Sequence, residues 1–338
     1  MPNVPKHDPS PPSGIILSRT DSIGDVMLTL PLAGLLKARF PGVRIIFIGR
    51  SYTRPVLQQC AHVDHILTLE ELQAGDAVAI LNALGADVIV HVFPQRPMAR
   101  WAKAACIPMR IGTTNRWWHW LTCTHRVAFS RKRSSLHEAQ LNTKLLDPLG
   151  FTATPTLAEL PAYTGFTPAP ADARAFPWSQ NDRRTVILHP GSKGSAVEWG
   201  LKNFTALIRL LNEGPYNVVV TGTVAEAERY RQELPLDHPH TFDAGGSLSL
   251  DELIGVIGAS HALVAASTGP LHIAAACGIR AIGLFSPRRP IHPGRWAPIG
   301  RDAHALVFDP ACAICAAGQP CDCIQRISPA RVLEVIRG

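Results

Sequence analysis

Two stretches of the sequence decide the fold: residues 14–25 read GIILSRTDSIGD, and residues 262–272 read ALVAASTGPLH. In each, a short apolar run is followed by small and polar residues and then by a helix-compatible stretch. A strand that leads into a helix has this pattern, and ligands of open α/β sheets bind where such strands end. We therefore expect two strand-to-helix turns that carry functional groups.

The composition is that of a globular protein. The chain has 338 residues, of which 46% are hydrophobic and 17% charged, and this length favours two domains. No apolar run approaches the roughly 20 residues of a membrane-spanning helix, and residues 1–13 are proline-rich without a signal-peptide core. The eight cysteines do not form the pattern of a secreted disulfide framework. We predict a cytoplasmic protein with a disordered tail over residues 1–13.

Strand-like and helix-like segments alternate on both sides of a proline-rich stretch. The predicted strands are residues 14–17, 44–48, 87–93, 185–188, 217–220, 262–265 and 281–285. The predicted helices are residues 26–40, with a break near Pro31, 98–106, 204–211, 250–259 and 270–277. This alternation predicts an α/β protein with two doubly wound, Rossmann-like domains that face each other across a cleft. We place the domains at residues 14–165 and 185–338, with a linker at 166–184.

Positive charge is concentrated in the first domain. The net charge is +7, and no acidic residue occurs between Asp87 and Glu138. The basic residues of this interval are Arg96, Arg100, Lys103, Arg110, Arg116, Arg126, Arg131, Lys132 and Arg133. Trp117, Trp118 and Trp120 lie among them, which suits an anionic, amphiphilic partner at a membrane surface; a solvated charged face is the alternative. We do not expect nucleic acid as a partner, because no motif of a nucleic-acid-binding module is present.

Three motifs occur together in one order along the chain. They are RTDSIGDVMLTLP at residues 19–31, HPGS at 189–192 followed by Trp199, and STGPLHIAAA at 267–276. The ordered set resembles the lipopolysaccharide heptosyltransferases, glycosyltransferase family 9, from residue 14 to the carboxyl terminus. The resemblance implies a GT-B fold, an acceptor held by the first domain and a nucleotide-sugar donor held mainly by the second. It also implies inversion at the anomeric carbon with no cofactor required and no metal for catalysis.

The resemblance assigns Asp25 as the base that removes the proton of the acceptor hydroxyl. Gly24 before it allows a substrate to come close, and the carboxylate then faces the cleft. A helix cap is the alternative role for Asp25, and Asp21 is a weaker candidate for the base. The expected acceptor contacts are Arg19, Ser22, Gly24, Arg96 and Arg100.

The other motifs predict a pocket for the departing diphosphate. Backbone N–H groups at a helix start bind phosphate, and Pro270 has the preset φ of a first helical position. His272 is either a phosphate or ribose contact or a core histidine. By resemblance, Glu226 binds ribose and Gly246 contacts the base; an exposed helix position is the alternative for Glu226. The predicted donor-binding residues are Ser192, Lys193, Thr221, Glu226, Gly246, Ser267, Thr268, Gly269, Pro270, Leu271 and His272.

Two positions depart from the family pattern. Glu198 stands where relatives often have a cation before the tryptophan, and an acid there should repel a diphosphate unless it points away. Lys193 or Lys202 is the expected substitute. Ser267 stands where the family often has Asp, which weakens the inference that the transferred sugar is heptose.

Four cysteines lie close together near the carboxyl terminus, at Cys312, Cys315, Cys321 and Cys323. Four thiolates at this spacing can bind a structural zinc ion or an iron–sulfur cluster, and disulfides or free thiols are the alternatives. None of these roles is catalytic.

These features predict an inverting glycosyltransferase that transfers a sugar, with heptose from ADP-heptose as a candidate, to a lipopolysaccharide-core or other cell-envelope saccharide. The predicted partners are a nucleotide diphosphate sugar and an anionic saccharide or lipid-linked acceptor. Peripheral contact with the cytoplasmic face of the inner membrane is also expected. The alternatives are a nucleotide-sugar epimerase of the same fold and a non-catalytic nucleotide-sugar-binding protein of envelope assembly.

Overall fold

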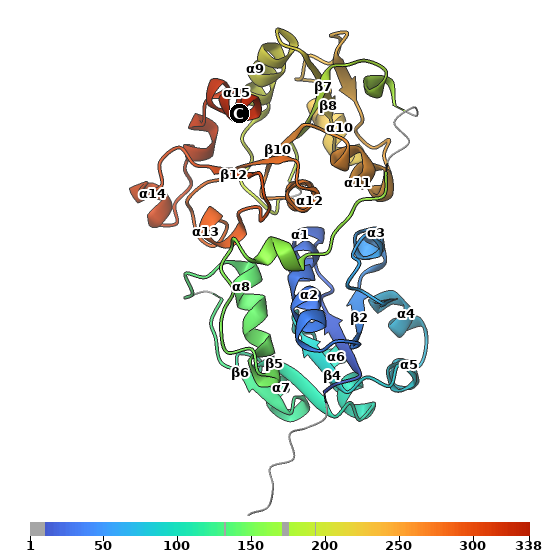
Figure 1. Ribbon diagram of the computed structural model, residues 1–338. Helices are drawn as coiled ribbons and strands as arrows, with labels where there is room; N and C mark the ends of the chain where they lie inside the picture. The colour runs from blue at the N-terminus through green and yellow to red at the C-terminus, as the bar shows by residue number, and fades with distance from the viewer. Residues whose placement is uncertain (1–10, 132, 171–175, 193) are drawn as a thin grey trace, which may run out of the picture.

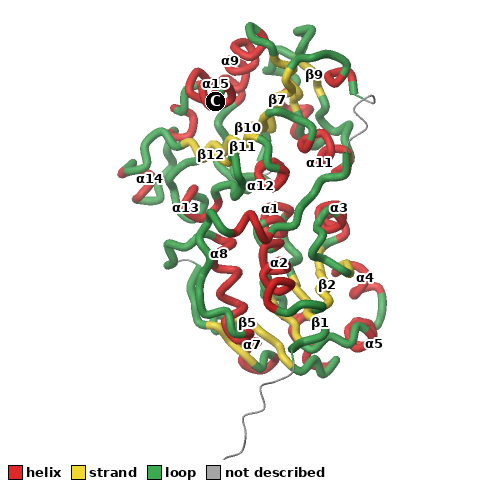
Figure 2. Tube along the Cα trace, in the orientation of Figure 1, coloured by secondary structure: helices red, strands yellow, loops and turns green. Residues whose placement is uncertain are grey.

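The computed structural model describes residues 11–131, 133–170, 176–192 and 194–338 (Figure 1). It contains two parallel six-stranded sheets, one in each half of the chain. Figure 2 shows the strands as two separate groups, each flanked by helices, with one group above the other. Most of the predicted tail, Lys132 and Lys193 lie outside the described residues.

The first sheet has the strand order β3-β2-β1-β4-β5-β6. Its strands are β1 (Gly14–Ser18), β2 (Arg44–Gly49), β3 (His65–Thr68), β4 (Val88–His91), β5 (Met109–Thr113) and β6 (His125–Val127). The helices of this half are α1 (Ile23–Met27), α2 (Leu30–Arg39), α3 (Arg54–Gln58), α4 (Leu69–Ala74), α5 (Ala77–Ala83), α6 (Arg96–Ala104), α7 (Trp117–Thr122) and α8 (Glu138–Thr143).

The second sheet repeats this topology with the order β12-β11-β10-β7-β8-β9. Its strands are β7 (Arg184–His189), β8 (Tyr216–Val220), β9 (Thr241–Asp243), β10 (Ala262–Ala266), β11 (Arg280–Leu284) and β12 (Ala303–Leu306). The helices are α9 (Leu201–Asn212), α10 (Val224–Tyr230), α11 (Leu250–Gly258), α12 (Gly269–Cys277), α13 (Pro293–Trp296), α14 (Ala313–Ala316) and α15 (Pro329–Arg337).

Burial of both sheet faces explains why the central strands read as continuous apolar runs. Every residue of β1 and of β10 is buried. In each sheet the strand order reverses beside the first strand of that half, between β1 and β4 and between β7 and β10. The turns after β1 and β10 therefore lie at the topological switch points, where open α/β sheets bind ligands. The prediction of two doubly wound α/β domains is confirmed.

The helix expected over residues 26–40 is divided into α1 and α2. Pro31 lies in the first turn of α2, where its missing N–H costs nothing, so the break comes just before it as predicted. The sequence did not predict β3, β5, β6, β9 and β12, because these strands are partly exposed and lack the continuous apolar run of the central strands.

The start of the predicted linker packs on the first domain. Phe166 forms an isolated β-bridge with Cys60, and the N–H of Thr167 donates to the carbonyl of Gln59 at 2.9 Å. The domain boundaries themselves stay a prediction. Among the described helices, none combines the length and apolar character needed to cross a membrane.

Candidate active site at the domain junction

The two strand-to-helix turns, in residues 14–25 and 262–272, meet where the domains touch. Helix α1 of the first domain packs against α12 of the second, and two glycines allow the close approach. A Cβ on Gly269 would lie 2.9 Å from the Ile23 side chain, and one on Gly24 would lie 3.0 Å from the His272 ring. Glycine is therefore required on both sides of the contact.

Asp25 lies in the first turn of α1 with both carboxylate oxygens bound. Oδ1 pairs with the Arg19 guanidinium, and Oδ2 accepts the Ser22 hydroxyl at 2.6 Å. The helix cap is Ser22, whose side chain accepts the backbone N–H of Asp25. The alternative in which Asp25 is itself the cap is thus wrong. The Asp25 side chain keeps 16% of its surface exposed, so a substrate can still reach it.

A buried ion-pair network holds Arg19, the partner of Asp25. Arg19 donates to Asp21 at 2.7 Å and to Glu138 of α8 at 3.4 Å. Glu138 is 1% exposed and also binds Arg131 and Arg295, each at 2.9 Å. Because Arg295 belongs to α13 of the second domain, this carboxylate ties the two domains together. The network fixes the Arg19 side chain and so orients Asp25.

The network also sets protonation states. Burial opposes the charge on Glu138, but Arg131, Arg19 and Arg295 outweigh it and lower the pKa of this carboxyl. For Asp21 burial is the larger effect, and it raises the pKa to about 6 although Arg19 opposes it. Burial lowers the pKa of His272 to about 3, and His137 nearby adds to this, so its imidazole is neutral. The junction thus combines a clamped acidic cluster with an uncharged histidine.

The first turn of α12 carries two buried polar atoms that the protein does not satisfy. Thr268 Oγ1 and His272 Nδ1 have no hydrogen-bond partner among the described residues. Thr268 is the residue before the helix and His272 lies in its first turn, so both are beside free backbone N–H groups of the helix start. Buried polar atoms without partners are rare in proteins, and a water molecule, an ion or a ligand can satisfy them. The turn is thus equipped to bind an anion.

The turn after β7 is organised by Glu198. Its Oε1 accepts both the N–H and the hydroxyl of Ser192 at 3.1 Å, and its Oε2 pairs with Arg229 of α10 at 2.7 Å. The acid that departs from the family pattern is therefore neutralised within the protein. Phosphate binding by Ser192 requires these bonds to rearrange. Lys202, one expected substitute, lies exposed on α9, and Lys193 is outside the described residues.

Glu226 and Thr221 lie together beside this turn. Glu226 is buried and accepts the N–H and hydroxyl of Thr223 at 2.8 Å, which closes a capping box at the start of α10. The exposed-surface interpretation of Glu226 is therefore wrong. Its carboxylate also contacts Gly191, where a Cβ would lie 2.3 Å from Oε1. Thr221 is paired with the His189 ring at 3.0 Å, and Gly246 has a φ of 73°.

Arg96 and Arg100 are separate from this group. Both are exposed on α6, and Arg96 stacks over the Trp117 ring of α7 at 4.9 Å. In Figure 1 α7 lies at the end of the first domain that is farther from the second. The basic stretch is thus divided. Arg131 binds Glu138 at the junction, whereas Arg96, Arg100 and Lys103 of α6 are exposed elsewhere.

The four clustered cysteines converge on one point. Their ligand atoms all lie within 4.8 Å of one another, and Cys315 and Cys323 are buried. The described structure contains these cysteines as free thiols, without a disulfide. Hydrogen bonding from the backbone N–H of Cys315 lowers the pKa of the Cys312 thiol to about 7, which favours a thiolate. Tetrahedral binding of one metal ion by four sulfurs fits this arrangement.

Sequence reasoning missed the buried charges at the junction. Glu138 has one sequence signal, since it is the first acid after the long acid-free interval. Asn142 accepts from Arg131 at 2.9 Å and donates to the Leu28 carbonyl at 3.2 Å, and Arg295 reaches across from α13. No local pattern marks either residue.

Two doubly wound domains that meet at α1 and α12, the helices that follow β1 and β10, have the GT-B arrangement. The family model of glycosyltransferase family 9 (heptosyltransferase) matches residues 102–322, more than half of the chain. This protein belongs to glycosyltransferase family 9 and is a glycosyltransferase.

Individual relatives agree with this assignment. A Haemophilus influenzae protein assigned as a glycosyltransferase is 27% identical over 315 residues, which are 88% of this chain and 89% of that protein. The Escherichia coli ADP-heptose lipopolysaccharide heptosyltransferase II superposes with a TM-score of 0.75 at 20% identity, covering 96% of this chain and 97% of that one. The dodecameric iron-containing heptosyltransferase TibC, solved with ADP-D-β-D-heptose, has a TM-score of 0.57 at 13% identity, covering 97% of this chain and 76% of that one.

Proposed function

We propose that this enzyme transfers a sugar from a nucleotide diphosphate donor to a lipopolysaccharide-core or related cell-envelope saccharide, with inversion at the anomeric carbon. One observation carries the proposal: helix α1, which bears the Asp25 carboxylate, contacts the start of α12. There Thr268 Oγ1 and His272 Nδ1 are buried and have no partner in the part of the chain that the structure describes. Glycosyl transfer in a single step requires two groups, a base for the acceptor hydroxyl and an anion-binding turn for the departing diphosphate.

Each side of the junction then has a defined task. Asp25 removes the proton from the acceptor hydroxyl while Ser22 and Arg19 hold its carboxylate in place. The N–H groups at the start of α12 and the Thr268 hydroxyl stabilise the departing diphosphate. His272 is neutral, so it binds the phosphate through a hydrogen bond rather than through charge.

ADP-heptose is the donor we propose. The names of two structural neighbours, heptosyltransferase II and TibC, refer to ADP-heptose, and the donor-binding positions of the second domain lie around the turns after β7, β8 and β10. In this proposal Ser192, Lys193, Thr221, Glu226 and Gly246 contact the nucleotide, and residues 267–272 contact the diphosphate and sugar. Ser267 offers the sugar a hydroxyl in place of a carboxylate.

The acceptor we propose is an anionic, lipid-linked saccharide. It is bound at the first-domain side of the junction by Gly24, Ser22 and Arg19, and the enzyme works in the cytoplasm at the inner face of the membrane. Because Arg96 and Arg100 lie on α6 beside α7, we propose that they contact the anionic surroundings of the acceptor rather than its reacting sugar.

We infer that Cys312, Cys315, Cys321 and Cys323 hold one zinc or iron ion. The convergence of four sulfurs within 4.8 Å supports this, and TibC is an iron-containing neighbour. When bound, the ion supplies a structural cross-link between the α14 turn and residues 321–323. Glycosyl transfer is carried by the chain's own residues at the junction.

Replacement of Asp25 tests the proposed function. Asp25→Asn keeps the size of the side chain and removes the base, so we expect turnover with ADP-heptose and an extracted lipopolysaccharide-core acceptor to fall at least about a hundredfold. ADP affinity, measured by calorimetry, is expected to stay within about twofold because Asp25 belongs to the other domain. Asp21→Asn is the matched control and is expected to retain more activity than Asp25→Asn.

Two outcomes of this experiment contradict the proposal. Equal turnover of Asp25→Asn and the unchanged enzyme removes Asp25 from the mechanism. Conversion of the donor sugar to an isomer in the absence of any acceptor supports the epimerase alternative instead.

A further inference from the structure

Helix α7 exposes three large apolar side chains within two turns. Trp117 and Trp120 are each 58% exposed, and Leu121 is 65% exposed. They are three of the eight large apolar side chains exposed among the described residues. Exposed apolar groups that occur singly need no explanation, but such a concentration on one short helix indicates an interaction surface.

Arginines lie directly on the tryptophans of this surface. The guanidinium of Arg96 is 4.9 Å from the Trp117 ring centroid, that of Arg116 is 5.6 Å from Trp118, and that of Arg126 is 4.7 Å from Trp120. These cation–π contacts hold each positive charge at the level of a ring. Apolar and cationic groups are therefore presented together.

The neighbouring helix α6 extends the positive surface. Arg96 and Arg100 line an open depression of about 630 Å³ together with Trp101, and Lys103 reaches over to the Leu121 carbonyl at 2.9 Å. No acidic residue occurs between Asp87 and Glu138, so nothing in this part of the chain offsets the charge. The α6–α7 surface is thus cationic and also exposes the apolar side chains of Trp117, Trp120 and Leu121.

We propose that the α6–α7 surface docks on a bilayer rich in anionic phospholipids. Tryptophan prefers the headgroup level of a membrane, where its ring is apolar on one side and wet at the N–H, and Leu121 adds an acyl-chain contact. Arginine and lysine side chains beside them bind the lipid phosphates. Nucleic acid would use the cations but leaves an exposed leucine without a partner.

The docking proposal rests on the proposed function only in explaining what docking would achieve for the enzyme. Docking at the far end of the first domain would keep the enzyme on the surface that carries its lipid-linked acceptor, without blocking the junction where α1 meets α12. The binding itself requires neither donor nor acceptor. Its failure can therefore be distinguished from failure of the glycosyltransferase proposal.

Vesicle co-sedimentation of the full chain tests the docking surface. We expect binding to vesicles that mix phosphatidylglycerol with phosphatidylcholine, and little binding to phosphatidylcholine alone. The triple variant Trp117→Ala, Trp120→Ala, Leu121→Ala and the double variant Arg96→Glu, Arg100→Glu are each expected to lower the partition coefficient at least about tenfold. The double variant leaves Trp117, Trp120 and Leu121 in place, so it measures the electrostatic contribution to vesicle binding.

Matched controls lie elsewhere on the surface. Leu157→Ala removes another exposed apolar group, and Arg331→Glu with Arg337→Glu reverses two charges on α15. Both controls, and Asp25→Asn, are expected to bind vesicles like the unchanged chain. The proposal is overturned if both surface variants bind vesicles as well as the unchanged chain does. It is also overturned if the unchanged chain binds a single-stranded oligonucleotide more tightly than vesicles and the same variants abolish that binding.

Discussion

Thr268 carries a buried hydroxyl with no hydrogen-bond partner among the described residues. A substitution that removes this hydroxyl should therefore affect stability and ligand binding differently. An unpaired buried polar group costs about 1–3 kcal/mol, whereas an apolar group of the same shape costs nothing of this kind. We predict that Thr268→Val keeps or raises the melting temperature and weakens ADP binding about tenfold. Thermal unfolding and calorimetric titration with ADP measure the two effects.

Thr143 provides the matched control. It is also buried, but its hydroxyl donates to the Gln140 carbonyl at 2.8 Å, and it lies on α8 rather than α12. Thr143→Val is expected to lower the melting temperature and leave ADP binding unchanged. A loss of stability in Thr268→Val would show that its hydroxyl bonds to the protein, and the anion-binding assignment would fail.

At the residue scale, the sequence indicates which side chains are at strand ends but not which of them are already occupied. Asp25 and the STGPLH turn follow apolar runs, so their places after strand ends could be predicted. Glu198 could not be interpreted, because its neutralising partner Arg229 is distant in sequence and comes close only when α10 packs beside the turn. The same holds for Glu226, whose burial depends on Gly191.

Among the local elements, the segment from α14 to residue 323 brings four thiols together. We predict that the purified protein contains about one zinc or iron ion per chain, since four sulfurs this close bind one tetrahedral ion. The double variant Cys312→Ser, Cys321→Ser is expected to lose the metal and several degrees of melting temperature. Elemental analysis and thermal unfolding report these outcomes, and Cys106→Ser, an exposed lone cysteine, is the control.

An unchanged metal content in the double variant would place the ion elsewhere and contradict the assignment. The cluster also illustrates what spacing alone leaves open. Metal, disulfide and free thiols were equally compatible with the spacing, and only the convergence of all four sulfurs favours a single ion. The twelve-residue α9 could be predicted from its periodicity and β10 from its apolar run, while three-residue β6 and β9 are defined by pairing with their neighbours.

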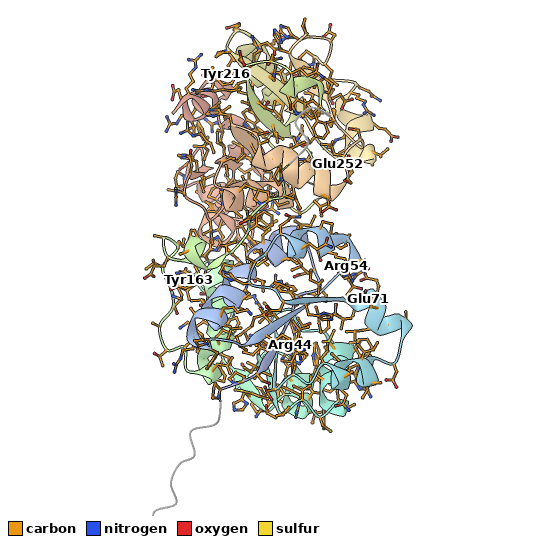
Figure 3. All side chains as sticks on the ribbon, turned by 45° about the vertical axis from the view of Figure 1, so that its right-hand side comes forward. Arg44, Arg54, Glu71, Tyr163, Tyr216 and Glu252 are labelled. Atoms are coloured by element: carbon orange, nitrogen blue, oxygen red, sulfur yellow. The ribbon has the colours of Figure 1, made fainter. Side chains whose placement is uncertain are left out.

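In the whole molecule, the contacts between the two domains differ from the ion pairs on the surface of each domain. Surface ion pairs within one domain are weak. One example is the pair of Arg54 and Glu71, both labelled in Figure 3, whose charged groups are 2.6 Å apart. The junction instead uses glycine-mediated helix packing and the buried Glu138, which binds arginines of both domains. Two repeats of one topology could be predicted from the sequence, but this cross-domain pairing could not.

Glu138 makes the stability of the junction dependent on pH. Its arginine partners lower its pKa below the ordinary 4.5, so its contribution is complete above that value and is lost as the pH falls through the folded-state pKa. We predict that Glu138→Gln destabilises the protein by about 3–5 kcal/mol at neutral pH, because the buried Arg19 and the partly buried Arg131 and Arg295 lose this counter-charge. The difference in free energy of unfolding between the unchanged protein and Glu138→Gln should narrow steadily as the pH drops below 4.5. Protonation then makes the Glu138 side chain neutral, as glutamine is. Denaturant unfolding over an acid pH series measures this difference, with Glu71→Gln as the exposed control that changes stability by less than about 1 kcal/mol. A difference that stays constant through the acid range would mean that packing of the Glu138 side chain, and not its charge, holds the domains together.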